Sequence, residues 1–263
     1  MSQDIFVEVG HGPTLIDNNI MLSDASLRFA TEGVALVHNL ICGALTCVGG
    51  GTGPRYTPYH MPHRTEVMGF MTVLHGDDRF YNNIFVQKWP SDDIITMHDS
   101  DDGFDTENRA AGTWMFDEYP TYDEWISQFD FSKPADMAKL YGAHEGKLPV
   151  WIEGNAYLGG AKPSKKDVNA LISAVAREDV RVELVQKEDG YYLDTNVYEL
   201  IEGFKNRMID SDVLGKAFEP EERFENPDGT AIRFDSDYFG THRGVDVIPG
   251  PFASKEEAAK KLY

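Results

Sequence analysis

The sequence predicts an all-β protein: a right-handed parallel β-helix of few coils, truncated at its N-terminus, followed by a small β-sandwich-like domain. Four segments share one plan, in which a short strand leads into a polar pair ending in asparagine and a second short apolar strand follows. These segments are Thr14–Leu22, Val34–Cys42, Asp78–Val86 and Val150–Leu158. Short strands bounded by turn residues are typical of β proteins.

The asparagine of each segment marks a corner of the predicted coil. These residues are Asn19, Asn39, Asn83 and Asn155. Asparagine tolerates the left-handed backbone region and can hydrogen-bond within its own turn, so it suits a sharp corner between two strands. Because the first two are 20 residues apart and later spacings are longer, the pattern predicts a solenoid with inserted loops. The alternative is a set of unrelated β-hairpins whose turns use asparagine.

The β-helix is expected over residues 1–160, and its insertions at 44–66 and 87–147 are expected to form a cleft on one side. A Gly, Pro and Lys cluster at 159–166 marks a boundary, after which residues 161–263 are expected to form the sandwich-like domain. Nothing ahead of the first strand, at residues 4–9, could cover an end coil. This predicts an upstream β-helix partner, self-association or a gene fragment.

The composition of the chain limits the classes of partner that it can bind. The chain has 263 residues, of which 41% are hydrophobic, enough to bury a core. Its net charge of −20 disfavours nucleic acid and anionic membranes, because phosphate binding needs clustered Lys and Arg. No stretch approaches the roughly 20 apolar residues of a membrane-spanning helix. The first ten residues lack the features of a signal peptide, so a cytoplasmic location is predicted.

The two cysteines and the acidic loop are interpreted as structural features. Cys42 and Cys47 are too few for a disulfide scaffold and have no metal-ligand company, so both are expected to be ordinary residues of a strand and its loop. The run from Asp99 to Asp105 resembles a calcium loop but lacks the closing Glu. A solvated acidic loop is the prediction and a cation site the alternative. No cofactor is predicted.

The densest group of chemically active residues lies between Arg55 and Val86. Two carboxylates that flank a sugar bond are the standard hydrolytic device. Asp77 and Asp78 are adjacent, so on a strand they point to opposite faces and only one can enter a given pocket. The partner must come from a neighbouring coil, and the candidates are Glu66, Asp24 and Asp17. The alternative for the Asp77–Asp78 pair is ordinary turn chemistry at the entry to a strand.

The histidines of the same stretch allow two interpretations. His60, His63 and Glu66 could hold a metal, but their spacing suits no extended strand and Pro62 excludes a regular helix. Hydrogen bonding to sugar hydroxyls or to a leaving group is the stronger prediction.

At these residues the chain resembles the C-terminal part of the right-handed β-helix glycosidases, most nearly glycoside hydrolase family 141, which includes α-L-fucosidase and xylanase activities. The resemblance is carried by residues 9–19, 57–67, 76–83, 154–163 and 235–240. It implies a β-helix followed by a β-sandwich, and hydrolysis by two aspartates in a cleft. One departure is the segment Ser26-Leu-Arg-Phe29, which ends in phenylalanine where relatives have an aspartate.

Two functions of different classes follow. The first is a glycoside hydrolase that uses Asp77, Asp78 and Glu66 in catalysis and acts on an oligosaccharide or polysaccharide. Its predicted substrate-binding residues are His11, His60, His63, Arg64 and Arg79. The second is a non-catalytic carbohydrate-binding or companion subunit that completes a larger β-helix enzyme.

Overall fold

The computed structural model describes residues 3–48, 56–98, 106–130, 132–133 and 147–263. It confirms the all-β class, because strands dominate and the few helices are short. The acidic run Asp99–Asp105 lies outside the described residues, so its interpretation stays a prediction.

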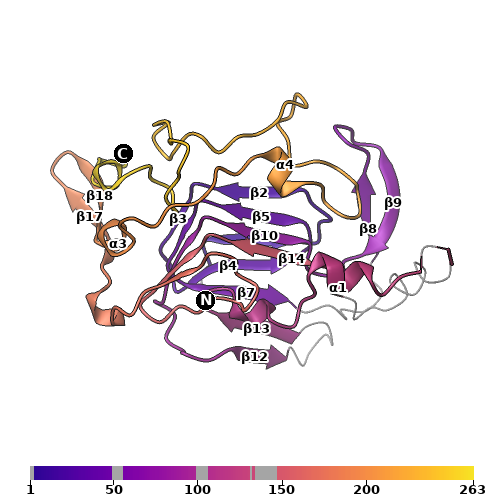
Figure 1. The fold of residues 1–263 in the computed structure, drawn as a ribbon, viewed down its shortest axis with the longest axis horizontal. Coiled ribbons are helices and arrows are strands. Elements are labelled where there is room, and N and C mark those ends of the chain that lie inside the picture. Colours follow the sequence, from indigo (N-terminus) through magenta and orange to yellow (C-terminus); the bar gives the residue numbers. More distant parts are fainter. Residues whose placement is uncertain (1–2, 49–55, 99–105, 131, 134–146) are drawn as a thin grey trace.

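Three sheets of mainly parallel strands form the body of the molecule (Figure 1). The first contains, in spatial order, β1 (Ile5–Glu8), β4 (Ala25–Ala30), β7 (Ala44–Val48), β13 (Thr106–Ala110) and β12 (Ile95–His98), of which the last two are antiparallel additions. The second contains β2 (Thr14–Asp17), β5 (Val34–Val37), β10 (Asp78–Tyr81) and β14 (Val150–Glu153). The third contains β3 (Ile20–Met21), β6 (Leu40–Ile41), β11 (Ile84–Val86), β15 (Ala156–Leu158) and β16 (Leu171–Ile172). The chain therefore visits the three sheets in rotation.

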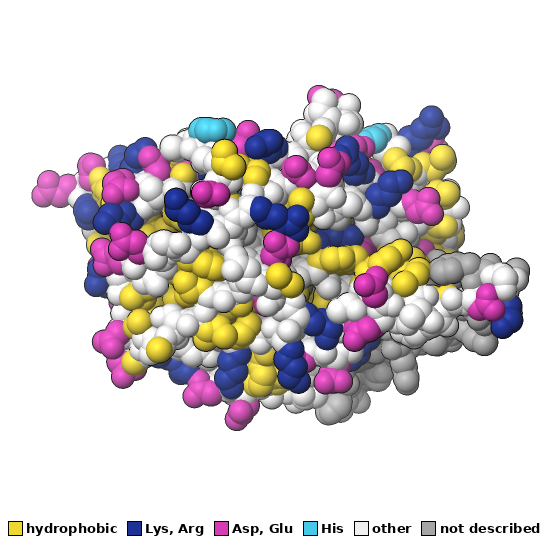
Figure 2. Space-filling model, viewed as in Figure 1, with side chains coloured by type: hydrophobic (Ala, Val, Ile, Leu, Met, Phe, Trp, Pro, Cys, Tyr) yellow, Lys and Arg dark blue, Asp and Glu magenta, His cyan; other side chains and the backbone are white. Residues whose placement is uncertain are grey.

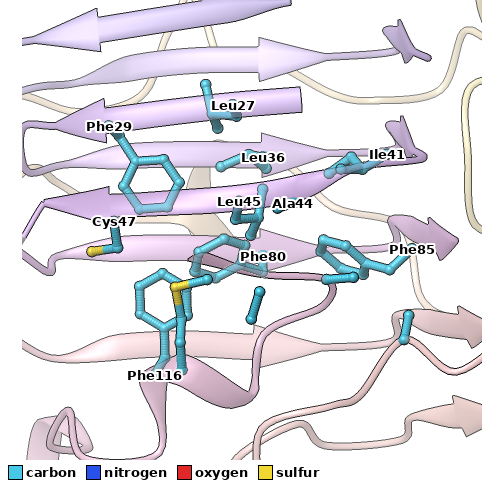
Figure 3. Packing of buried hydrophobic residues seen from close by; sticks show 14 of the residues in the cluster. Leu27, Phe29, Leu36, Ile41, Ala44, Leu45, Cys47, Phe80, Phe85 and Phe116 are labelled. Carbon is cyan, nitrogen blue, oxygen red and sulfur yellow. The ribbon is translucent and has the colours of Figure 1, made fainter. Parts of the chain in front are cut away.

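The hydrophobic core lies between these sheets, and Figure 3 shows its side chains pointing toward one another. Phe80 of β10 packs on Phe116 with 4.8 Å between ring centroids, and Phe29 of β4 stacks on Phe116 at 5.9 Å. All three rings are at most 1% exposed. Burial of each such side chain stabilises the fold by roughly 1.5–3 kcal/mol, so the interior is the main source of stability.

The predicted asparagine corners form a hydrogen-bonded row between the second and third sheets. Asn39 Oδ1 accepts from the backbone N–H and side-chain amide of Asn19, and Asn83 and Asn155 each accept in the same way from the asparagine before them. The left-handed backbone belongs to the residue in front of each asparagine. These residues are Asn18, His38, Asn82 and Gly154, with φ of 54°, 57°, 56° and 73°. The row asparagine itself supplies the hydrogen bonds.

Residues 161–263 do not form the predicted sandwich. Their described regular strands are β16 and the hairpin of β17 (Val182–Lys187) and β18 (Gly190–Thr195), so no second packed sheet is present among them. Short helices α3 (Val197–Leu200), α4 (Ser211–Leu214), α5 (Lys255–Ala258) and η2 (Arg177–Asp179) interrupt the segment. Its apolar side chains pack instead on the parallel sheets, as Phe224 and Phe234 do with Ala35 and Tyr81. The predicted domain boundary at residue 160 stays a prediction.

The other described elements project from the sheets or cover them. They are the hairpin of β8 (Tyr56–His60) and β9 (Val67–Thr72), η1 (Trp114–Phe116) and α1 (Tyr122–Ile126). Among the described residues, no helix is long and apolar enough to cross a membrane. The cytoplasmic location stays a prediction. Cys42 and Cys47 are free and buried, as expected.

Candidate functional site

The predicted chemistry is concentrated where successive turns of chain enter the second sheet. Residues 9–13 precede β2, residues 31–33 precede β5 and residues 75–77 precede β10. Glu32 bridges to Gly76 in parallel register, which places these three corners side by side. A Cβ on Gly33 would lie 2.9 Å from the carbonyl oxygen of His11 and 3.3 Å from Asp77 Oδ2, so glycine permits this close approach.

His11 and Glu32 form a buried pair at this corner. His11 Nδ1 lies 2.6 Å from Glu32 Oε1, and Glu32 Oε2 accepts from the backbone N–H of Leu74 at 2.7 Å. The other ring nitrogen of His11 lies 3.1 Å from the carbonyl oxygen of Thr57. Burial disfavours the charged imidazolium, but the hydrogen bond and charge of Glu32 outweigh it and raise the pKa of His11. A protonated His11 ring satisfies both neighbours, because its Nδ1–H donates to Glu32 and its Nε2–H donates to the carbonyl oxygen of Thr57.

Asp77 lies beside this pair and is 2% exposed. Its Oδ1 is 2.8 Å from Arg79 Nη1, and its Oδ2 accepts from the backbone N–H of Phe218 at 2.8 Å. Burial raises the pKa of Asp77 to about 6, although Arg79 and the Phe218 N–H favour the charged form. Asp77 therefore exchanges its proton near neutral pH.

Asp78 is the first residue of β10, directly after Asp77, whose backbone is left-handed with φ of 56°. It is 1% exposed; its Oδ1 accepts from the backbone N–H of Val34, and its Oδ2 has no hydrogen-bond partner among the described residues. Burial raises the pKa of Asp78 well above its usual value. Asp78 is thus a buried carboxyl group whose charged form is disfavoured by its surroundings.

Glu219 is the carboxylate that sequence reasoning missed. Burial raises its pKa to about 7, and the charges of Glu32 and Asp77 add to this effect while His11 opposes it. Its Oε1 is buried, with no hydrogen-bond partner among the described residues. Glu219 reaches the corner from a segment more than 140 positions beyond Asp77. The only sequence signal was the acidic run around Pro220, which is also ordinary surface chemistry.

Two hollows are lined by residues that flank Glu219 in the sequence. The larger, a groove of about 560 Å³, is lined by Val9, His11, Thr57, Tyr59, His60, Pro220 and Glu222, among others. The smaller, about 260 Å³, is lined by Asp77, Tyr122, Trp125, Trp151, Phe218 and their neighbours. The flanking residues Phe218 and Pro220 thus belong to different hollows.

The structure brings some predicted site residues together and leaves others apart. His11, His60 and Asp77 line the two hollows. His63 Nε2 instead lies 2.7 Å from Glu225 Oε1, which joins the β8–β9 hairpin to the C-terminal segment. Arg64 and Glu66 form an exposed pair at 3.9 Å on the turn of that hairpin. No group of metal ligands occurs among the described residues.

Arg79 is held by main-chain groups. Its Nε donates to the carbonyl oxygen of Leu214 at 2.9 Å and its Nη2 to that of Lys216 at 2.6 Å. Its guanidinium also lies over Trp151, 4.5 Å from the ring centroid. Arg79 is 3% exposed, so the structure gives it the role of anchoring the C-terminal segment.

The surface in Figure 2 has Lys and Arg side chains interspersed with Asp and Glu over the face shown.

Comparison with known proteins gave one informative likeness. No family model matches the chain, and no curated protein matches it. The chain is similar to XylC, whose structure was solved as a complex with xylose: the TM-score is 0.80 and the sequence identity 29% over 99% of this chain. The match spans 38% of the XylC chain. The resemblance to glycoside hydrolase family 141 therefore stays a prediction.

Proposed function

We propose that this chain is a carbohydrate-active protein of the glycoside hydrolase type, acting on glycosidic bonds of neutral sugars. The observation that carries the proposal is the cluster of Asp77, Glu219 and the His11–Glu32 pair beside a groove. Two of its carboxyl groups have pKa values raised to about 6 and about 7. Hydrolysis of a glycosidic bond requires one protonated and one ionised carboxyl group at neutral pH. The likeness to XylC, whose structure was solved as a complex with xylose, supports the sugar class.

Within this proposal, Glu219 is the proton donor and Asp77 the ionised partner. Glu219 has the higher pKa, and its Oε1 has no competing hydrogen-bond partner among the described residues. Three carboxylates were predicted from the sequence to be catalytic, and of these Asp77 lines a hollow. Asp78 is directed into the interior and Glu66 lies on an exposed turn, so we assign neither to the reaction. His11 lines the groove, and Glu32 holds the imidazole ring in place there.

We further infer that the three parallel sheets are the faces of a right-handed parallel β-helix. Support comes from the rotation of the chain through the sheets and from the pairing of each strand of the second sheet with its counterpart in the next turn. The row of asparagines at one corner agrees with stacked coils. Such a solenoid places the corners that bear His11, Glu32 and Asp77 in one line.

A second candidate function is a companion module that completes a larger β-helix. Three observations favour it. β1, β2 and β3 each stand at the edge of their sheet, and Asn19 stands first in the asparagine row, where it donates to Asn39. The chain also spans only 38% of the XylC chain it matches. In this case the sugar contacts would be shared with further coils.

The two functions are separated by hydrolysis of an aryl-glycoside panel containing β-xyloside, α-L-fucoside, α-L-arabinofuranoside and β-galactoside. The hydrolase predicts turnover that Asp77→Asn and Glu219→Gln each reduce at least about 100-fold, as loss of a general acid or base does. The exposed Glu66→Gln is the matched control and should retain activity. The wild-type rate should fall as the pH rises above about 7, where Glu219 loses its proton. Folded protein without turnover on every substrate contradicts the hydrolase and favours the companion module.

A further inference from the structure

The smaller hollow is a built pocket between α1 and the segment that follows α4. Its wall contains Asp77, Tyr122, Trp125, Trp151, Leu214 and Phe218. α1 is fixed at its start by a capping box, in which the Thr121 side chain accepts from the Glu124 N–H and the Glu124 carboxylate accepts from the Thr121 N–H. This cap holds Tyr122 and Trp125 at the pocket.

Trp125 lines the pocket and carries an unused hydrogen-bond donor. The side chain is 5% exposed, and its Nε1 has no partner among the described residues. Its ring is fixed by edge-on contact with Phe218, 5.1 Å between centroids, and with Phe129 at 5.2 Å. A buried indole N–H normally finds an acceptor, so this donor calls for one from a ligand.

We propose that this pocket binds a single neutral sugar ring on the leaving-group side of the bond that the carboxylate cluster cleaves. The assignment rests on the proposed function, because Asp77 belongs both to the cluster and to the pocket wall. The sugar hydroxyls accept from the Trp125 indole N–H and donate to the Asp77 carboxylate. The C–H face of the ring packs on Tyr122, which lines the pocket and is half exposed.

The size and charge of the pocket select this ligand. Its volume of about 260 Å³ is below the roughly 300–1,000 Å³ typical of drug-sized ligands, so it accommodates one ring. Asp77 and Arg79 pair at 2.8 Å, and Arg79 already occupies the face of Trp151. An anionic sugar would meet the acidic cluster and a cation would find its aromatic site taken. A plain aryl ring would leave the indole N–H without an acceptor.

The test is the affinity of methyl β-D-xylopyranoside, measured by ligand-observed NMR with the full chain. Trp125→Phe keeps a packed ring and removes the indole N–H, and it should weaken binding about fivefold, the value of one hydrogen bond of about 1 kcal/mol. Trp89→Phe is the matched control: Trp89 is also buried with an unpartnered Nε1 among the described residues, but it does not line this pocket. It should leave the affinity unchanged.

Tyr122→Ala provides a second variant that does not threaten folding, since Tyr122 is 50% exposed. It should weaken binding by a similar factor, whereas Tyr238→Ala at another exposed site should not. Glucuronate should not compete. Equal affinity in wild type, Trp125→Phe and Tyr122→Ala, or a loss seen only in the groove variant His60→Ala, would overturn the assignment. A folded chain that binds the glycoside through Trp125 but hydrolyses nothing would sink the hydrolase and leave the pocket standing.

Discussion

Asp77 shows how burial of one carboxyl group makes the stability of the fold depend on pH. Its carboxyl group is buried, yet Arg79 and the Phe218 N–H favour its ionised form, and the balance raises the pKa to about 6 from the ordinary 3.8. Below pH 4 the group is protonated in both the folded and the unfolded chain. Between pH 4 and 6 the folded chain holds a proton that the unfolded chain has lost. Stability contributed by this group is therefore lost as the pH rises through that window.

Asp77→Asn tests this linkage. The variant cannot ionise, so its free energy of unfolding relative to wild type should rise by about 3 kcal/mol between pH 4 and pH 7. Denaturant unfolding at both pH values measures the change. Asp93→Asn, at an exposed position, is the control and should show no such change. A difference between Asp77→Asn and wild type that stays constant with pH would contradict the burial argument.

At the scale of elements, the asparagine row links four corners of the chain, at Asn19, Asn39, Asn83 and Asn155. Asn83 is fully buried: its Oδ1 accepts from Asn39, its backbone N–H donates to Asn155, and its side-chain amide donates to the carbonyl oxygen of Leu36 and to Asn155. Its side chain thus satisfies buried groups on two neighbouring corners, which no apolar residue could replace.

We expect Asn83→Ala to lower the free energy of unfolding by about 3–5 kcal/mol, because it leaves buried donors and acceptors unpaired. Asn226→Ala, in an exposed turn where the amide donates to Thr230, should cost less than about 1 kcal/mol. The comparison is made by denaturant unfolding of both variants. Equal effects would mean that the row contributes no more than a surface turn.

These corners could be predicted from the sequence because the same residue pattern occurs at each of them. A pattern that recurs rarely arises by chance, so it marks a structural position. Asn19, Asn39, Asn83 and Asn155 were therefore found correctly as corner residues. Nothing repeats in the C-terminal segment. Phe224 and Phe234 contact the sheets at irregular intervals, so period-based reasoning predicted a sandwich where the chain forms a cover. Glu219 was missed for the same reason.

At the scale of the whole molecule, the C-terminal segment completes the site. It supplies Glu219 to the carboxylate cluster and Phe218 to the aromatic pocket. The backbone N–H of Phe218 also donates a hydrogen bond to Asp77. Arg79 fastens this segment to the second sheet through the carbonyl oxygens of Leu214 and Lys216. The geometry of the site thus depends on how firmly the cover is docked.

Arg79→Lys tests this dependence. Lysine has a single nitrogen and cannot reach both carbonyl oxygens and Asp77 in the planar arrangement that a guanidinium provides. Amide hydrogen exchange around residues 214–218 should therefore accelerate at least about tenfold, while exchange in β5 and β10 stays slow, because their bonds lie within the second sheet. Arg64→Lys, on the exposed turn of the hairpin, should leave both regions unchanged. Uniform acceleration across the sheets would instead show that the cover and the sheets unfold as one cooperative unit, and the site would then open only when the whole protein does.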